Sequence, residues 1–321
     1  MTFISTWTKS GQGIWFHASA GERSCQSSPQ EQKYPMKRHS YLCVAHVAGF
    51  VTWLATELES STLFQHAYTN RRSNAQWACT SLYDAFQRYS WNHPGNVRLG
   101  YNAGACTTSN AIALDALRRD LQAAGGNDAL CLQASADVMA WGGVTARNTD
   151  WLKANERGLA SMLQSVKMAI DAQDSESPVL RAAGLRFNSG MTKIYSLICD
   201  NFVIYDSRVA AAMGWLVAKY CQAKGLSQVP KELCFPWSAA KEGENTLVPK
   251  RRNPAVGNLY FKRLRAGRHH ALWNLRASWV LSAALDHPAA QASRFNTHVA
   301  APTNALRALE AALFMIGYDL A

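Results

Sequence analysis

The stretch RFNSGMTKIYSLICDNFVIYDSRVAAAMGWL, residues 186–216, contains the residues on which the prediction of fold and chemistry depends. An apolar residue, Phe187, precedes a tight polar turn at 188–190, and a short helix is predicted over 192–198. Residues 179–185 are typical of another short helix. The local order is therefore helix, hairpin, helix.

The second half of this stretch predicts a further helix with a defined start. Asp200 and Asn201 end the preceding helix because both residue types favour turns over helix interiors. The apolar run at 202–205 predicts extended chain. Asp206 then precedes Ser-Arg-Val-Ala-Ala-Ala-Met, a strong helix former. Its carboxylate is expected to cap that helix by accepting bonds from the first backbone amides.

Two residues of this unit are candidates for catalysis. Lys193 lies in the first turn of its helix, where the helix dipole disfavours the charged amine, and burial would lower its pKa further. A neutral lysine amine is a nucleophile. Asp206, thirteen residues later, would supply an anion beside it. An amine and a carboxylate together suit displacement at the anomeric carbon of a sugar. A solvated Lys193 and a purely structural Asp206 cap are the alternatives.

The pattern resembles the helix-hairpin-helix DNA glycosylases, in particular the branch with the 8-oxoguanine-glycosylase (OGG) fold. That family has an apolar residue, a glycine-bearing hairpin, a Thr-Lys pair, an apolar helix and an aspartate that opens the next helix. Here these features are Phe187, Gly190, Thr192-Lys193 and Asp206. The resemblance implies a mainly α fold, with two helical subdomains and a cleft between them. It makes Lys193 the Schiff-base nucleophile and Asp206 the assisting carboxylate.

The same resemblance implies a function on double-stranded DNA. The enzyme would flip out a modified base and excise it, and AP lyase strand cleavage would be able to follow. Some members defend cells by excising α-glucosyl-5-hydroxymethylcytosine from phage DNA, and we rank this substrate first. Excision of 8-oxoguanine in repair is the alternative, and a non-enzymatic helix-hairpin-helix DNA-binding module is another. The aromatic candidates for the base pocket are Trp141, Tyr205 and Trp237.

Composition and charge placement favour a nucleic-acid partner. The chain has 321 residues, 48% hydrophobic and 17% charged, as is typical of a globular protein. Its net charge is +11. Residues 181–280 hold 16 Lys and Arg against 5 Asp and Glu, so this segment carries the whole excess. Such concentration indicates a polyanionic partner.

The residues expected to hold DNA are in the hairpin and in this basic region. Backbone amides of a hairpin can grip phosphate, and Lys and Arg neutralise it. The predicted set is Ser189, Gly190, Thr192, Lys250, Arg251, Arg252, Arg265 and Arg268.

Cysteine and histidine spacing predicts neither a metal nor another cofactor. The eight cysteines contain no C-x-x-C pair, and the histidines lack H-E-x-x-H spacing. We interpret the cysteines as reduced residues of a cytoplasmic protein. The most apolar segment, 41–56, contains His46 and is short for a membrane span, so a buried helix is predicted there. We expect a monomer without membrane contact.

Three regions are predicted along the chain. Residues 1–35 are an irregular polar arm, 36–175 an N-terminal helical subdomain, and 176–321 the catalytic and DNA-binding subdomain. The boundary is placed in the polar linker 172–178. Apolar periodicity and capping residues predict the remaining helices at 74–89, 110–124, 129–141, 150–159, 271–285 and 303–316.

Overall fold

Helices dominate the computed structural model, which describes residues 37–321 apart from 72, 145–146, 243–245 and 248. The mainly α prediction is confirmed. The elements are α1 (Arg38–Leu42), α2 (Ala45–Glu57), β1 (His66–Asn70), β2 (Ala75–Cys79), α3 (Leu82–Gln87), α4 (Thr107–Ala124), α5 (Asp128–Trp141), α6 (Asn148–Ala154), α7 (Leu159–Asp171), α8 (Pro178–Arg181), α9 (Met191–Ile198), α10 (Ser207–Ala223), η1 (Lys231–Leu233), α11 (Arg268–Asp286), η2 (Pro288–Ala290), α12 (Arg294–Thr297) and α13 (Ala305–Ile316). The predicted arm at 1–35 lies outside the described residues.

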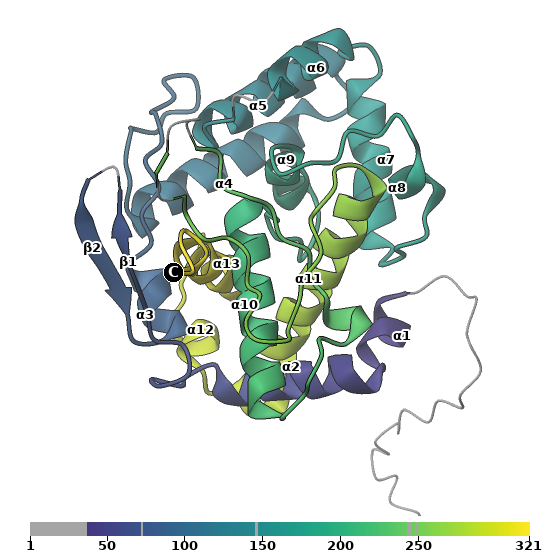
Figure 1. The fold of residues 1–321 in the computed structure, drawn as a ribbon. Helices are drawn as coiled ribbons and strands as arrows, with labels where there is room; N and C mark the ends of the chain where they lie inside the picture. The colour runs from purple at the N-terminus through teal and green to yellow at the C-terminus, as the bar shows by residue number, and fades with distance from the viewer. Residues whose placement is uncertain (1–36, 72, 145–146, 243–245, 248) are drawn as a thin grey trace, which may run out of the picture. The chain divides into compact units, whose positions relative to one another are not determined.

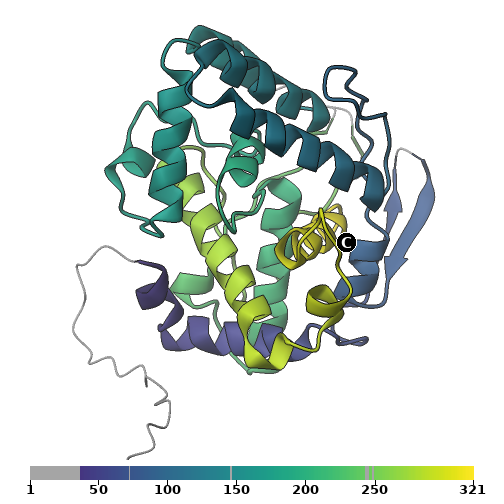
Figure 2. The same cartoon turned by 180° about the vertical axis from the view of Figure 1, so that it is seen from behind.

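Two helices are the centres of packing. Helix α13 contacts α3, α10, α11 and α12, and it lies inside the molecule in both views (Figures 1 and 2). Helix α9 contacts α4, α5 and α7. The chain passes from the α9 group to the α13 group through residues 199–206, so the catalytic candidates lie where the two groups meet.

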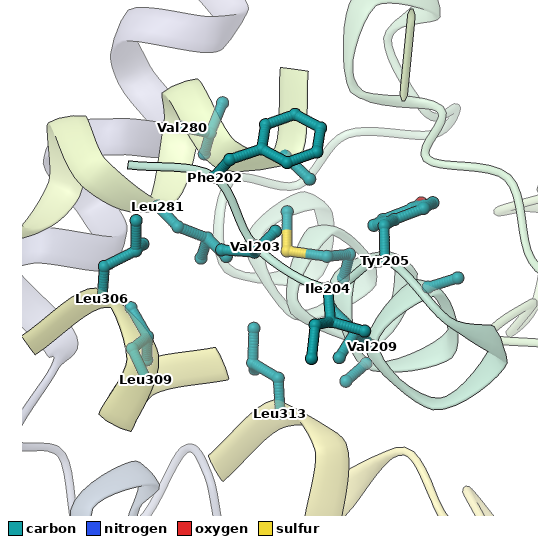
Figure 3. Close-up of a cluster of buried hydrophobic side chains, with 14 of the residues drawn as sticks. Phe202, Val203, Ile204, Tyr205, Val209, Val280, Leu281, Leu306, Leu309 and Leu313 are labelled. Carbon is teal, nitrogen blue, oxygen red and sulfur yellow. The ribbon is translucent and has the colours of Figure 1, made fainter. Parts of the chain in front are cut away.

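The extended run that was predicted at 202–205 is buried between helices. Figure 3 shows Phe202 to Tyr205 among apolar side chains of α10, α11 and α13. Among the described residues no strand pairs with this run, and side chains bond several of its backbone polar groups instead. Ser278 Oγ accepts a bond from Val203 N at 3.1 Å, and Asn274 Nδ2 donates to the Val203 carbonyl at 2.9 Å.

The predicted helix at 74–89 is wrong over its first half. Residues 75–79 form β2, which pairs antiparallel with β1, and α3 begins only after the Ser81 cap. Tyr68 and Trp77 are partners across this hairpin and stack with ring centroids 4.8 Å apart. Tyr68 also stacks on Tyr318 near the end of the chain. These distant partners override the local helical periodicity.

The other predicted helices differ less from the structure, mainly at their ends. The predicted helix at 179–185 stops at Arg181, and the one at 150–159 ends at Ala154, where Asn155 begins a turn before α7. The segment 41–56 is helical but is divided between α1 and α2. The remaining predicted helices correspond to α4, α5, α11 and α13.

Helices from the two predicted subdomains pack against each other. The described residues belong to one compact unit, in which α2 contacts α11 and α3 contacts α13. The predicted linker 172–178 is mainly turn, and a short bridge joins Asp174 to Lys37.

One cysteine differs from the expectation that all eight are reduced. Cys43 is disulfide-bonded, so that expectation is wrong at this position. The other described cysteines are free, at positions 79, 106, 131, 199, 221 and 234. Among the described residues, no helix combines the length and apolarity that crossing a bilayer needs.

Candidate active site

The hairpin before α9 is held by one asparagine. Asn188 Oδ1 accepts bonds from the backbone amides of Gly190 and Met191, at 2.9 and 3.1 Å. Asn148 bonds the Asn188 amide group in turn. Gly190 is buried, and a Cβ at this position would lie 2.0 Å from Asn148 Nδ2. The backbone amides of Gly190 and Met191 are therefore bonded within the protein.

Of the three predicted hairpin contacts to DNA, only Ser189 is partly exposed. Thr192 is fully buried, and its hydroxyl donates to the Ser189 carbonyl at 3.0 Å. Gly190 is buried as well. The hairpin thus positions α9 instead of presenting a row of free amides.

Lys193 is buried in the first turn of α9. Its side chain is 9% exposed, and its hydrogen bond from Nζ to the Ser189 carbonyl is long, at 3.5 Å. Its stem passes over Gly142, where a Cβ would lie 2.4 Å from Lys193 Cδ. Burial lowers the pKa of Lys193, and the Asp206 and Glu310 carboxylates oppose part of this shift. The amine is more easily neutral here than in water.

Asp206 caps α10 as predicted. Its Oδ1 accepts bonds from Arg208 N at 2.8 Å and from Val209 N at 3.0 Å. Its Oδ2 has no hydrogen bond within the described part of the chain. A single oxygen therefore accepts both cap bonds.

Lys193 and Asp206 line the same cavity, of about 180 Å³. The two side chains come from different helices, and among the described residues they form no ion pair within 4 Å. The aromatic residues of the cavity wall are Phe86, Tyr89, Trp91, Trp141 and Phe314. Trp91 Nε1 donates to the Trp141 carbonyl at 3.0 Å, and Trp141 Nε1 donates to Asn110 Oδ1 at 3.1 Å. The wall is therefore fixed by its own hydrogen bonds.

A buried carboxylate, Glu310, forms another part of the wall. It is 5% exposed, accepts a bond from Ile204 N at 2.6 Å, and is paired with Arg307. Burial raises its pKa, and Arg307 opposes that change. The bond to Ile204 fixes the extended run just before Asp206.

A larger cavity of about 650 Å³ lies on the other side of this pair, since Arg307 and Glu310 line both spaces. Its wall comes from α4, α7, α9 and α13 and is mainly polar.

One of the three predicted base-pocket aromatics, Trp141, lies at the cavity. Tyr205 is fully buried elsewhere: its hydroxyl donates to the Pro236 carbonyl at 3.1 Å, and His270 Nε2 bonds its carbonyl oxygen at 2.7 Å. Trp237 packs under Arg263, 4.2 Å from ring centroid to guanidinium carbon, and does not line the cavity.

The predicted DNA-binding cations have different environments. Lys250 is paired with Glu242, and Arg268 with Glu176 at 3.4 Å. Arg252 is 5% exposed and donates to the Tyr318 carbonyl and Ser207 Oγ, at 2.8 and 2.7 Å.

Arg251 and Arg265 remain exposed. Arg251 donates to the carbonyls of Asn253 and Ala255, at 3.3 and 2.7 Å. These two side chains are the predicted cations most available to a partner.

The sequence prediction missed several cavity residues, most of which come from remote segments. They are Trp91, Asn110, Arg208, Arg307, Glu310 and Phe314. Arg208 carried a usable signal, because it is two residues after the capping Asp206 and so must lie in the same helical turn. The others lack any sequence signal, since their approach depends on how α4 and α13 pack.

No protein-family model, no curated protein and no solved structure matches this chain.

Proposed function

We propose that this protein is a DNA glycosylase that extrudes a modified base and excises it. The observation that carries the proposal is the cavity that joins Lys193 and Asp206 within aromatic walls. The two groups come from α9 and from the start of α10, and a structural lysine and a structural cap would not need to share one cavity.

The chemistry of this pair suits displacement at the C1′ atom of a deoxynucleotide. The Lys193 amine attacks C1′, and the C1′–N bond breaks with its electron pair leaving on the base. The amine gives up a proton and the departing base takes one up. Positive charge develops on the sugar in the transition state, and the Asp206 carboxylate stabilises it. The lowered pKa of Lys193 favours the neutral amine that this step requires.

The aromatic wall suits a base that has left the helix stack. A flipped base loses stacking with its neighbours, and aromatic side chains replace part of it. Trp91 and Phe314 lie edge to face with ring centroids 5.6 Å apart, and both line the cavity. These residues would exclude water from C1′ as well.

For the base we propose α-glucosyl-5-hydroxymethylcytosine, with 8-oxoguanine as the alternative. A cavity of about 180 Å³ has the volume of about six water molecules, enough for a heterocyclic ring but not also for a hexose. The glucosyl group would have to extend beyond it. The 650 Å³ cavity behind Arg307 and Glu310 offers polar space on one side.

A binding module without catalysis is supported less well. Such a module grips phosphate with free hairpin amides, whereas the amides of Gly190 and Met191 donate to Asn188. A module also gains nothing from a buried lysine.

The test is excision from a panel of duplexes that differ in one base. Purified protein is incubated with duplexes carrying 8-oxoguanine, uracil, 5-hydroxymethylcytosine or its α-glucosylated form, and released base is measured by mass spectrometry. We expect release from the glucosylated duplex, and none from an unmodified control. Release of 8-oxoguanine alone would favour a function in DNA repair over excision of the glucosylated base from phage DNA. Release from no duplex, with tight DNA binding, would favour the binding module.

A further inference from the structure

A guanidinium stacked on aromatic rings faces the same cavity. Arg208 is in the first turn of α10, and its guanidinium carbon lies 4.1 Å from the ring centroid of Phe314 and 4.8 Å from that of Tyr318. A third ring, that of Trp91, lies 5.7 Å away. The rings hold the plane of the guanidinium by cation–π attraction and leave its edge for other contacts.

Arg208 differs from a neighbouring arginine in its hydrogen bonding. Within the described residues, Arg208 donates no side-chain hydrogen bond and forms no ion pair within 4 Å. Arg208 is half-buried, whereas Arg252, a nearby arginine, is buried and its guanidinium donates to Tyr318 and Ser207. Arginine has five donors and no acceptor, and those of Arg208 are partly exposed where the residue lines the cavity. A planar donor fork that is open at a cavity and stacked on rings is suited to a ligand with acceptors along one edge.

The backbone fixes the place of this fork. The amide of Arg208 donates to the capping Asp206. Its carbonyl lies against Gly317, where a Cβ would come within 1.9 Å of the oxygen. The cap, this close backbone contact and the aromatic rings together position Arg208 at the cavity that Asp206 also lines.

We propose that Arg208 reads the edge of the extruded base and selects a base with two adjacent hydrogen-bond acceptors. This inference rests on the glycosylase function proposed above. The planar fork donates two parallel bonds, as arginine does to the O6 and N7 atoms of guanine. Cytosine offers the same chemistry with N3 and O2.

This selection distinguishes the candidate substrates. In 8-oxoguanine the N7 atom carries a hydrogen, so the acceptor pair of guanine is lost. In uracil the N3 atom carries a hydrogen between the two carbonyl oxygens. A substituent at C5 of cytosine leaves N3 and O2 unchanged. The fork therefore favours cytosines modified at C5 over 8-oxoguanine and uracil.

The experiment compares Arg208→Lys and Arg208→Gln with wild type in two assays. The first measures the excision rate on the modified-cytosine duplex, and the second the affinity for a duplex with a stable abasic analogue, which has no base to read. A bidentate pair is worth about 1–3 kcal/mol of base discrimination, roughly 5- to 150-fold in rate. We expect a loss in that range for both variants, with abasic affinity within twofold of wild type.

Arg263→Lys is the matched control. Arg263 stacks on Trp237 at 4.2 Å but lies outside the cavity, so its replacement should leave excision unchanged. Thermal unfolding of each variant checks the fold.

The possible outcomes separate this inference from the proposed function. Normal excision by the folded Arg208 variants would overturn the role in base reading. Equal loss of excision and of abasic affinity would overturn it too and would assign Arg208 to the DNA backbone. A wild-type protein that excises no base of the panel would overturn the glycosylase proposal, and this inference with it.

Discussion

The hairpin unit, residues 186–216, and the basic segment, residues 250–268, both carry charged residues with predicted functions, but different forces position them. In the hairpin unit Lys193 lies in the first helical turn and Asp206 at the cap, as the sequence predicts. In the basic segment the neighbours of each cation are set by remote parts of the chain, such as Tyr318 beside Arg252.

The difference shows which sequence signals are local. A helix cap needs only the next three residues, so Asp206 finds its amides whatever the rest of the chain does. A run of Lys and Arg residues in the sequence does not indicate which of their side chains will be buried. Three adjacent residues, Lys250, Arg251 and Arg252, are respectively paired, exposed and buried. Net charge indicates a partner, but only the fold assigns the contacts.

The largest effect is expected at Lys193. Lys193→Ala should abolish the covalent protein–DNA adduct that borohydride traps, because among the described residues no other lysine lines the small cavity. Lys219→Ala is the matched control: burial lowers the pKa of Lys219 too, but it lies over Trp215, outside the cavity. The measurement is the amount of adduct resolved on a denaturing gel. Full-rate base excision by Lys193→Ala would instead make water the nucleophile.

The pH dependence of trapping should report the burial of Lys193. Adduct formation should rise with pH as the amine loses its proton, and level off below the ordinary lysine pKa of about 10.4. In the pH range between the lowered pKa of Lys193 in the folded protein and this ordinary value, the unfolded chain binds more protons than the folded one. The free energy of unfolding should therefore increase with pH in this range. Lys193→Met should lack this increase. A pH midpoint at or above the ordinary lysine value would contradict the lowered pKa.

A smaller effect is expected at Asp206, where charge and capping can be separated. Asparagine caps helices as well as aspartate, so Asp206→Asn should keep stability and DNA binding while excision falls by about 100- to 1,000-fold. Asp206→Ala should lose, in addition, about 1 kcal/mol of unfolding free energy. Excision rate and urea denaturation measure the two effects. Wild-type excision by Asp206→Asn would reduce Asp206 to a structural cap.

The parts of this site that the sequence predicted are those with local causes. The turn at 188–190, the start of α9 and the Asp206 cap follow from residues within a few positions of each other. Trp141 was identified because it ends a helix beside two glycines. The pairing of Lys193 with Asp206 rested on a family resemblance and not on spacing.

The parts that were not predicted depend on packing between distant segments. Trp91 and Phe314 meet at the cavity although more than 200 residues separate them. Tyr205 directly precedes Asp206, yet its ring points into the core, because the extended run alternates its side chains. The β1–β2 hairpin was missed for the same reason as the cavity wall, since its stacking partner Tyr318 lies near the other end of the chain.

The smallest effects are expected in the basic segment, where Arg251 and Arg252 form a matched pair. Arg251 is exposed and bonds only nearby carbonyls, so Arg251→Ala should leave the fold unchanged. If Arg251 neutralises one phosphate, the slope of log binding constant against log salt should fall by about 0.9. Fluorescence anisotropy of a labelled duplex at several salt concentrations gives that slope.

Arg252→Ala should have the opposite profile. Its buried guanidinium bonds the Tyr318 carbonyl and Ser207 Oγ, and hydrogen bonds of a charged group contribute about 1.5–3 kcal/mol each. The unfolding free energy should therefore fall by about 3–6 kcal/mol for the two bonds together, while the salt slope of the folded protein stays as in wild type. Because Ser207 follows Asp206, the loss should also loosen the start of α10 and slow excision. A changed salt slope with unchanged stability would mean that Arg252 leaves its buried position to meet DNA, and that the basic segment rearranges on binding.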